Sequence, residues 1–326
     1  MTDFRKVLAT TAVSALALMG CRDAATSDAD AADARPETVV GDTVAARAEP
    51  TLRNDQLLDE PFIYSVTDAD SEVILYPTIH ALPDGVEWKT PALEAAMARA
   101  DEIWFELAPG ALTDPATQTA FMEMSMDGTP LSERLSEEQY AELGEDLEAA
   151  GIPAAALEPF EPWMAAVSLT QIQMMKAGFS PELGVETQLE AMIGDRPSRG
   201  LETVRKQLGY FDTLDEDAQI DFLLQGAGEL DEAIELLNKL SVAWAEGDVE
   251  FIETEVVNAM RDDTPAVYDA LLVQRNADWA EQLDAELQGE GVDFVAVGAA
   301  HLIGADSVPA MLAQRGYDVK LLTLQE

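Results

Sequence analysis

Two histidines and one glutamate stand where short apolar segments of the chain end. His301 follows the run Phe294 to Val297 and the small-residue turn Gly298-Ala299-Ala300. His80 follows a similar apolar run, and the 326-residue chain contains no other histidine. Glu106 ends a third such run. Because ligands of open α/β sheets bind at the carboxyl ends of the parallel strands, we expect these three side chains to lie close together.

These residue types suit two kinds of chemistry. Two neutral imidazoles with one or two carboxylates suit a divalent metal such as Zn, Mn or Co, which would activate a bound water and polarise a carbonyl group. Glu202, at the end of the short extended segment that begins at Arg199, is a candidate for the second carboxylate. Without a metal, the same groups suit a histidine general base that a glutamate orients. The residues alone leave both readings open.

Arg275 lies on the apolar face of a predicted helix. Thr264 and Pro265 predict the start of this helix, as an N-cap followed by proline in the first turn. Its apolar stripe consists of Val267, Leu271, Trp279, Leu283 and Leu287, and Arg275 falls on the same stripe. A guanidinium that faces a core is rarely left unpaired. Arg275 therefore either snorkels or pairs structurally, or it stabilises a developing oxyanion at the site.

The elements that must position these residues predict one α/β domain. β-Branched and aromatic runs predict strands over 62–66, 72–76, 102–105, 294–297 and 317–324. Helical patterns cover 91–100, 160–176, 185–193 and 215–262, with Met174 and Met175 as core-filling residues, and a capping box begins at Ser136. We expect a central mixed sheet wrapped by helices, with a large helical insertion between the N-terminal and C-terminal strand motifs.

The charge balance excludes one class of partner. The chain has 19 basic and 63 acidic residues, a net charge of −44, and no basic stripe. Binding to nucleic acid through phosphate contacts is therefore not expected. The acidic excess fits either a solvated shell or the capture of a cation or basic partner, and composition does not separate the two.

The first residues predict export. Arg5 and Lys6 precede a mostly apolar run that is too short to span a bilayer, which is the layout of a signal peptide. The run ends in Leu18-Met19-Gly20-Cys21, which resembles the lipobox of bacterial lipoproteins and implies lipidation of Cys21. An ordinary signal peptide with a coincidental cysteine is the alternative. We expect a signal peptide over 1–20, a disordered acidic tether over 21–55 and the folded domain over 56–326, lipid-anchored in the cell envelope at the outer membrane and facing the periplasm.

Six segments carry a resemblance to a known family over about residues 61 to 323. In chain order they read PFIYSV, VILYPTIHALP, ADEIWFEL, RGLETVRKQL, LLVQRNADWAEQL and VAVGAAHLIGADSVPAMLAQRGYDV. They resemble the TraB/GumN family, which is related to the Tiki proteins. The resemblance implies an α/β fold akin to erythromycin-esterase-like and ChaN-like proteins, and a metal-dependent peptidase activity.

Carried over residue by residue, the family motifs fall on positions already noted. They are His80, Glu106, Glu202 with Gln207, Arg275 with Asn276, and Gly298 with His301. The expected function is hydrolysis of peptide or amide bonds in an exported lipoprotein. His80, His301 and Glu106 are the expected metal ligands, with Glu106 alternatively a base and Glu202 a further ligand or base. Arg275 is expected to polarise substrate or order Glu106, and Asn276 to hold the rim. A haem- or metal-binding protein without catalysis, and a catalytically dead scaffold, are the alternatives.

The chain departs from the family at the first histidine motif. Pro77 stands where the family has glycine, three residues before His80. Proline fixes φ and removes an amide hydrogen. If that amide binds a ligand, Pro77 costs activity, whereas a glycine that merely ends the strand can be replaced.

Overall fold

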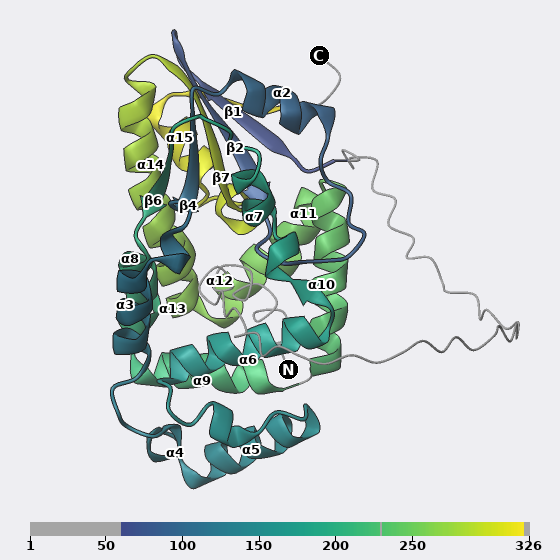
Figure 1. Cartoon of the computed structure of the whole chain (residues 1–326), viewed down its shortest axis with the longest axis vertical. Helices are drawn as coiled ribbons and strands as arrows, with labels where there is room; N and C mark the ends of the chain where they lie inside the picture. Colours follow the sequence, from purple (N-terminus) through teal and green to yellow (C-terminus); the bar gives the residue numbers. More distant parts are fainter. Residues whose placement is uncertain (1–59, 229, 323–326) are drawn as a thin grey trace, which may run out of the picture.

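The computed structural model of the protein describes residues 60–228 and 230–322 (Figure 1). The predicted signal peptide, Cys21 and the predicted tether lie outside the described residues, so these remain predictions. Within the described ranges the chain forms one α/β body, in which a sheet occupies one end and a helical block covers its carboxyl edge (Figure 1). No helix in these ranges is long and apolar enough to cross a membrane.

The main sheet that the described residues form has six strands in the order β6-β4-β7-β2-β1-β8. They are β1 (Ile63–Thr67), β2 (Ser71–Thr78), β4 (Glu102–Leu107), β6 (Ser198–Glu202), β7 (Gly291–Gly298) and β8 (Asp318–Leu322). β2, β7, β4 and β6 are parallel, and β1 runs antiparallel between β2 and β8. A second pair joins β3 (Leu82–Pro83) and β5 (Phe179–Ser180).

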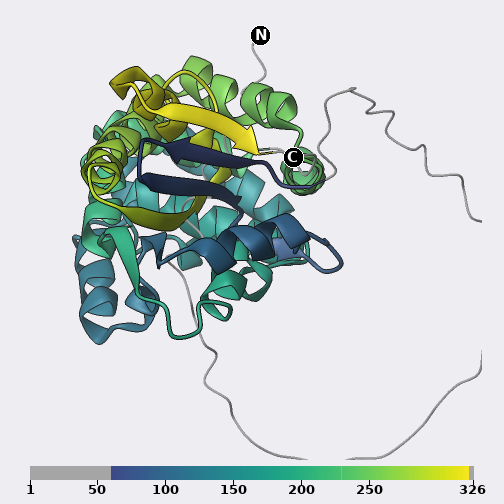
Figure 2. The same cartoon turned by 90° about the horizontal axis from the view of Figure 1, so that it is seen from above.

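The parallel strands hold the centre of the core. β2 and β7 are buried along their second halves, as expected for apolar strands that helices cover on both faces. Tyr76 of β2 stacks on Phe294 of β7, with ring centroids 5.7 Å apart. The register pairs Thr78 with Gly298, so these two strands end at the same level. Figure 2 shows the strands side by side with helices on either side.

Helices make up the remainder of the fold. They are α2 (Pro91–Arg99), α3 (Pro115–Ser125), α4 (Leu131–Arg134), α5 (Glu137–Ala149), α6 (Pro162–Lys176), α7 (Val185–Glu190), α8 (Val204–Asp212), α9 (Glu216–Ala227), α10 (Leu230–Ala245), α11 (Val249–Ile252), α12 (Ala259–Asp263), α13 (Pro265–Tyr268), α14 (Gln274–Leu287) and α15 (Val308–Arg315). π-Helical turns, η6 (Glu253–Asn258) and η7 (Asp269–Val273), interrupt two long helical stretches. The pair α6 and α9 lies below the sheet edge, and α4 and α5 lie at the far end (Figure 1).

The predicted fold class is confirmed, and most elements lie where the patterns placed them. The capping box is present, because Ser136 accepts from the Gln139 amide while the Gln139 side chain accepts from the Ser136 amide. Two details were wrong. Met175 is 52% exposed, and Met174 alone fills the core. Thr264 does not cap α13, because its hydroxyl donates back to the carbonyl of Met260.

Candidate functional site

Four sequence-predicted residues meet at the carboxyl edge of the parallel strands. His80 follows β2, His301 lies in the 3₁₀ turn η8 (Ala299–Leu302) after β7, and Glu106 and Glu202 lie at the ends of β4 and β6. Each is at most 7% exposed. Because β2, β7, β4 and β6 are parallel, these side chains come from one edge, as the sequence predicted.

Arg275 reaches this edge from the helical block. All the predicted apolar residues of its stripe are buried, and Arg275 is itself 1% exposed. The π-helical turn η7 directly precedes α14, and such turns change which carbonyl groups the helix ladder uses. The Nη1 atom of Arg275 donates to the carbonyl of Leu271 at 3.3 Å. The guanidinium also lies over the ring of Trp279, 4.7 Å from its centroid.

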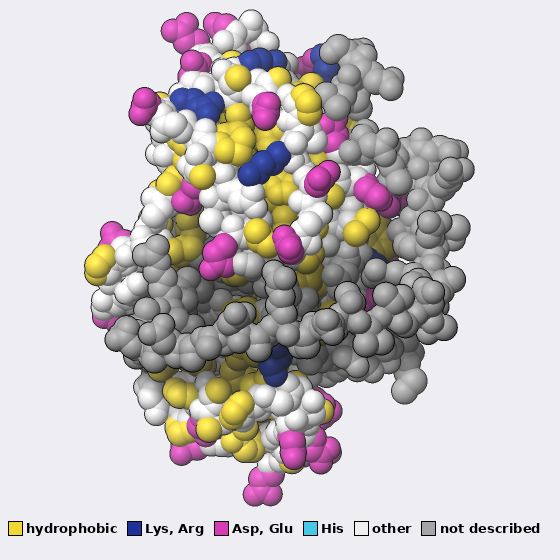
Figure 3. All heavy atoms as spheres, turned by 45° about the vertical axis from the view of Figure 1, so that its right-hand side comes forward, with side chains coloured by type: hydrophobic (Ala, Val, Ile, Leu, Met, Phe, Trp, Pro, Cys, Tyr) yellow, Lys and Arg dark blue, Asp and Glu magenta, His cyan; other side chains and the backbone are white. Residues whose placement is uncertain are grey.

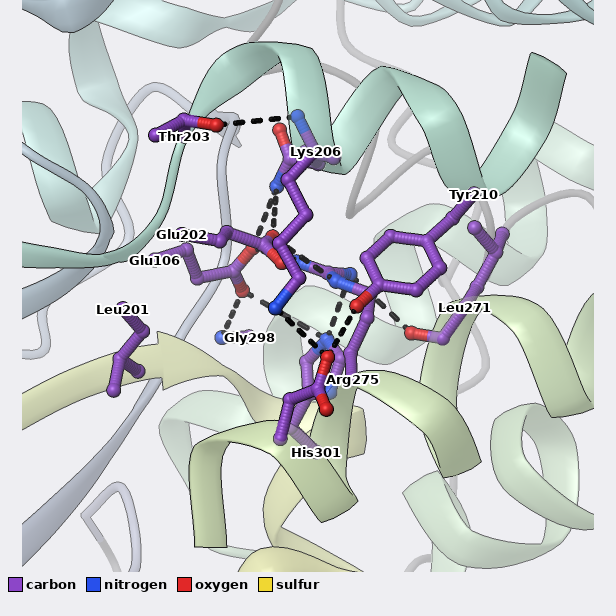
Figure 4. A network of polar contacts seen from close by, with 12 residues as sticks. Glu106, Leu201, Glu202, Thr203, Lys206, Tyr210, Leu271, Arg275, Gly298 and His301 are labelled. Carbon is purple, nitrogen blue, oxygen red and sulfur yellow. Dashed lines mark hydrogen bonds and ion pairs between the residues drawn. The ribbon is translucent and has the colours of Figure 1, made fainter. Parts of the chain in front are cut away.

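Every N–H group of Arg275 has an acceptor (Figure 4). Nε donates to Glu202 Oε1 at 3.0 Å, and Nη2 donates to Glu202 Oε1 and Glu106 Oε2, both at 2.6 Å. Nη1 donates to Leu271 and to His301 Nε2, the latter at 3.1 Å. A guanidinium carries five N–H donors, so none is left for a substrate carbonyl. Of the two roles expected for Arg275, the arrangement favours ordering Glu106.

Gln207 completes the contacts around the two carboxylates. This residue of α8 is 1% exposed, and its Nε2 donates to Glu106 Oε2 and Glu202 Oε1, both at 3.1 Å. Glu202 and Gln207, five residues apart in one motif, thus belong to the same network, because Gln207 donates to the carboxylate oxygens that also accept from Arg275. Gln207 Oε1 and Glu202 Oε2 are buried without a hydrogen-bond partner among the described residues.

The single positive charge of Arg275 is shared by two buried carboxyl groups, whose pKa values shift in opposite directions. Burial opposes the charge of Glu106, but the charge of Arg275, with further contributions from its neighbours, lowers the pKa of Glu106 from its usual 4.5 to about 2. Burial raises the pKa of Glu202, and Arg275 offsets this only in part. Glu106 is therefore the ionised partner, and Glu202 is the carboxyl group that takes a proton more readily.

The stability of the protein is expected to depend on pH in opposite directions through these two groups. As pH falls, Glu202 takes its proton first in the folded state, so this group adds stability down to its usual pKa near 4.5. Glu106 contributes stability above 4.5 and loses about 3 kcal/mol as pH falls towards 2. Urea unfolding of wild type, Glu202→Gln and Glu106→Gln at several pH values measures both. As pH falls, the free energy of unfolding of Glu202→Gln should lack the increase that Glu202 causes, and that of Glu106→Gln should lack the decrease that Glu106 causes. Parallel curves of unfolding free energy against pH for all three proteins would contradict this.

His301 is a neutral imidazole in a fixed tautomer. Because arginine can only donate, His301 Nε2 must accept from Arg275, and Nδ1–H must donate to Asn276 Oδ1 at 2.6 Å. Asn276 is held in turn by its Nδ2, which donates to the carbonyl of Asp306 at 2.7 Å. Burial and the charge of Arg275 lower the pKa of His301 well below 6.5. Asn276 is 1% exposed, so it orients His301 from within the core and does not form an exposed rim.

Gly298 lets the backbone of β7 approach Glu106. Its amide donates to Glu106 Oε1 at 2.8 Å. A Cβ atom at this position would lie 3.1 Å from that oxygen and 3.4 Å from His301 Cδ2. The close approach expected from this small-residue turn is therefore present, and it binds the second oxygen of Glu106.

Sequence reasoning missed Glu186, which lies against His80. His80 Nδ1 contacts Glu186 Oε1 at 2.6 Å, and the hydroxyl of Thr78 also donates to that oxygen. His80 Nε2 is buried and has no hydrogen-bond partner among the described residues. Burial lowers the pKa of His80, but the charge and hydrogen bond of Glu186, with help from Glu106, outweigh it and raise the pKa above 6.5.

Gly184 is the local signal that places Glu186. It is the residue before α7, and a Cβ atom there would lie 2.1 Å from the carbonyl oxygen of His80. The next amide, that of Val185, donates to the carbonyl of Ile79 at 2.9 Å. Only glycine lets the start of α7 dock this closely on the His80 segment, and Glu186 then lies beside the imidazole.

Pro77 does not interrupt β2. The recorded pairing of β2 with β1 ends at Leu75, so proline lies beyond it, while the pairing with β7 continues through Pro77 opposite Val297. The carbonyl of Pro77 accepts from Trp244 Nε1 at 3.2 Å. The two histidine motifs therefore differ in chemistry: Gly298 donates its amide to Glu106, whereas Pro77 has no amide to donate.

The expected metal ligands do not offer a set of free donors in this arrangement. Both nitrogens of His301 and both oxygens of Glu106 have partners, and the partner of His301 Nε2 is a cation. Of the expected ligand atoms among the described residues, His80 Nε2 and Glu202 Oε2 have no hydrogen-bond partner. The described residues contain no group of three His, Cys, Asp or Glu side chains arranged to hold a metal ion. The metal roles of His80, His301 and Glu106 stay predictions, and a metal bound by His301 Nε2 or Glu106 Oε2 would have to displace Arg275 from that atom.

Comparison with known proteins places the chain in a family. The chain is 29% identical over 191 residues to a protein of Escherichia coli (strain K12) described as uncharacterized protein YbaP, covering 56% of this chain and 67% of that protein. The Shigella flexneri protein of the same description matches equally. No solved structure matched the chain. The model of the TraB/PrgY/gumN family matches residues 62–321, which span every element of the site. This chain therefore belongs to the TraB/PrgY/gumN family.

Proposed function

We propose that this protein hydrolyses peptide or amide bonds, with His80 as general base. One observation carries the proposal: the buried imidazole of His80 has Nδ1 held by a carboxylate at 2.6 Å, and its Nε2 has no hydrogen-bond partner in the part of the chain that the structure describes. A general base needs one nitrogen fixed by an orienting group and the other available for a proton. Titratable groups with shifted pKa values surround it, as is common at catalytic sites.

The proposed reaction uses the chain's own groups. His80 Nε2 removes a proton from a water molecule as the water oxygen bonds to the substrate carbonyl carbon. Glu186 holds the Nδ1–H and stabilises the imidazolium that forms. The imidazolium then returns the proton to the leaving amine as the carbon–nitrogen bond breaks. Glu106, Arg275 and His301 form a hydrogen-bonded network beside the reacting groups. His301 adds no charge to this network because its imidazole is neutral.

A peptide-cleavage experiment tests the proposal. The purified protein is incubated with a synthetic peptide library, with and without EDTA, and products are identified by mass spectrometry. Wild type should cleave with EDTA present and His80→Gln should not, while Lys239→Met, an exposed pair partner of Glu235 on α10, should match wild type. Cleavage that needs Zn, Mn or Co and is lost in His301→Gln would instead support the metal-dependent form with His80, His301 and Glu106 as ligands.

The same experiment separates the non-catalytic alternatives. No cleavage under any condition would overturn the proposal. A Soret band that appears on adding haem, and disappears in His80→Gln or His301→Gln, would then favour a haem-binding protein. An unchanged phenotype when either variant replaces the wild-type gene would favour a scaffold.

We also propose that the protein is an exported lipoprotein, anchored through Cys21 to the outer membrane and facing the periplasm. The basic start, the apolar run and the cysteine after Leu18-Met19-Gly20 support this. Metabolic labelling with palmitate should mark the wild type and not Cys21→Ser, and the label should fractionate with the outer membrane. A soluble, unlabelled wild type would contradict the proposal.

A further inference from the structure

Lys206 is a cation beside the site whose side chain still reaches solvent. Lys206 is at the third position of α8, four residues after Glu202, and its side chain is 43% exposed. Figure 4 shows it reaching from α8 across the carboxylate network towards α14. Its charge is close enough to Glu202 to oppose the rise in that group's pKa. Arg275, in contrast, is fully buried and has no N–H to spare.

The partner of Lys206 can be exchanged. Lys206 Nζ lies 2.8 Å from Asp278 Oδ2, and Asp278 is itself 44% exposed. Exposed ion pairs contribute little to stability, so another carboxylate can compete for the ammonium group. Tyr210, one turn further along α8, donates its hydroxyl to the same oxygen at 2.8 Å. Asp278 therefore keeps a hydrogen bond when Lys206 leaves it.

The negative charge of the whole molecule makes a solvent-accessible lysine beside the site informative. The net charge is −44, and acidic side chains are spread over the face in Figure 3, where Lys and Arg are few. This field repels anions, and the network of Glu106, Glu202 and Arg275 adds a further negative charge when both carboxyl groups are ionised. A neutral or cationic substrate needs no lysine here, whereas an anionic one does.

From these contacts we infer that Lys206 binds a carboxylate group of the substrate, exchanging Asp278 for it. The inference rests on the hydrolase function proposed above and specifies its substrate class: peptides or amides that carry a free carboxylate. That carboxylate comes from the chain terminus or from an acidic side chain. Lys206 is then a specificity-determining residue, and Asp278 holds it in place when no substrate is bound.

Two variants should shift substrate recognition in opposite directions. Lys206→Met keeps the apolar stem and removes the charge, and should raise KM for carboxylate-bearing peptides by about tenfold. Asp278→Asn can still accept from Tyr210 but releases Lys206, and should lower that KM about threefold. Lys239→Met, whose lysine pairs with Glu235 elsewhere, should leave KM as it is. A merely structural ion pair would make Lys206→Met and Asp278→Asn behave alike, which would overturn the inference.

The probes are N-acetylated hexapeptides made as free acids and as C-terminal amides, each with Asp or Asn in the middle. If the protein prefers the free acid over the amide and this preference depends on Lys206, then Lys206 binds the terminal carboxylate. If it prefers Asp over Asn in the same way, then Lys206 binds the acidic side chain. Binding of these peptides to His80→Gln protein is measured by calorimetry, which needs no turnover. A Lys206-dependent preference there without cleavage in wild type would support this inference while the hydrolase proposal fails. Equal dissociation constants for all forms, or no binding, would overturn the inference.

Discussion

Replacing Glu186 with glutamine is expected to lower kcat/KM for peptide cleavage by roughly 10²- to 10⁴-fold, the range found for general bases and their orienting carboxylates. Glutamine fills the same space, but it removes the negative charge 2.6 Å from His80 Nδ1. The imidazole then loses both the group that fixes its tautomer and the charge that stabilises its protonated form. Steady-state cleavage of one library peptide measures the effect.

The pH profile of Glu186→Gln distinguishes a catalytic effect from a general loss of structure. His80 acts as a base only when neutral, so activity rises as pH passes through its pKa. Because Glu186 raises that pKa, its loss should move the rising limb to lower pH. Glu94→Gln is the matched control, since it makes the same exchange in the first turn of a helix, α2, where the side chain is exposed. Equal rates and profiles for the two variants would show that Glu186 does not act through His80.

The sequence predicted the site residues that lie at the ends of strands. Local apolar runs identify strands, and parallel pairing brings their carboxyl ends together, so His80, Glu106 and His301 could be grouped without a structure. Arg275 gave a further signal, because an arginine on an apolar stripe is rarely left without a partner, and carboxylates are its usual partners. That requirement and the predicted metal site compete for the same oxygen atoms. The structure gives those atoms to the guanidinium, a choice that depends on distances that no sequence pattern contains.

Glu186 could not be found in this way. The chain has 63 acidic residues, so a glutamate in the first turn of a short helix is not a distinctive signal. Its partnership with His80 depends on a long-range docking between Gly184 and the His80 carbonyl. The predictions for Met175 and Thr264 were wrong for a related reason. A sequence pattern places a residue on a helix, but the surrounding residues decide whether its side chain is buried or caps the helix. Met174 and Met175 share the last turn of α6, yet Met174 is 1% exposed and Met175 is 52% exposed, because adjacent residues face different sides of a helix.

Replacing Arg275 with methionine is expected to lower the free energy of unfolding by roughly 3–5 kcal/mol, as for other broken buried ion pairs. Methionine retains much of the apolar stem but leaves Glu106 and Glu202 buried without their cation. Urea denaturation measures the loss. Arg205→Met is the matched control, because Arg205 pairs with Glu123 at the surface with its side chain 60% exposed, and its loss should cost at most about 1 kcal/mol.

A triple variant identifies the origin of that loss. If uncompensated charge is the cause, adding Glu106→Gln and Glu202→Gln to Arg275→Met should restore a large part of the stability, because two neutral amides need no cation. If lost packing against Trp279 is the cause, the triple variant should be no more stable than Arg275→Met. Recovery would mean that the carboxylates alone create the need for a cation at the sheet edge. The arginine would then occupy, as a structural counterion, the position that the family resemblance assigned to a metal.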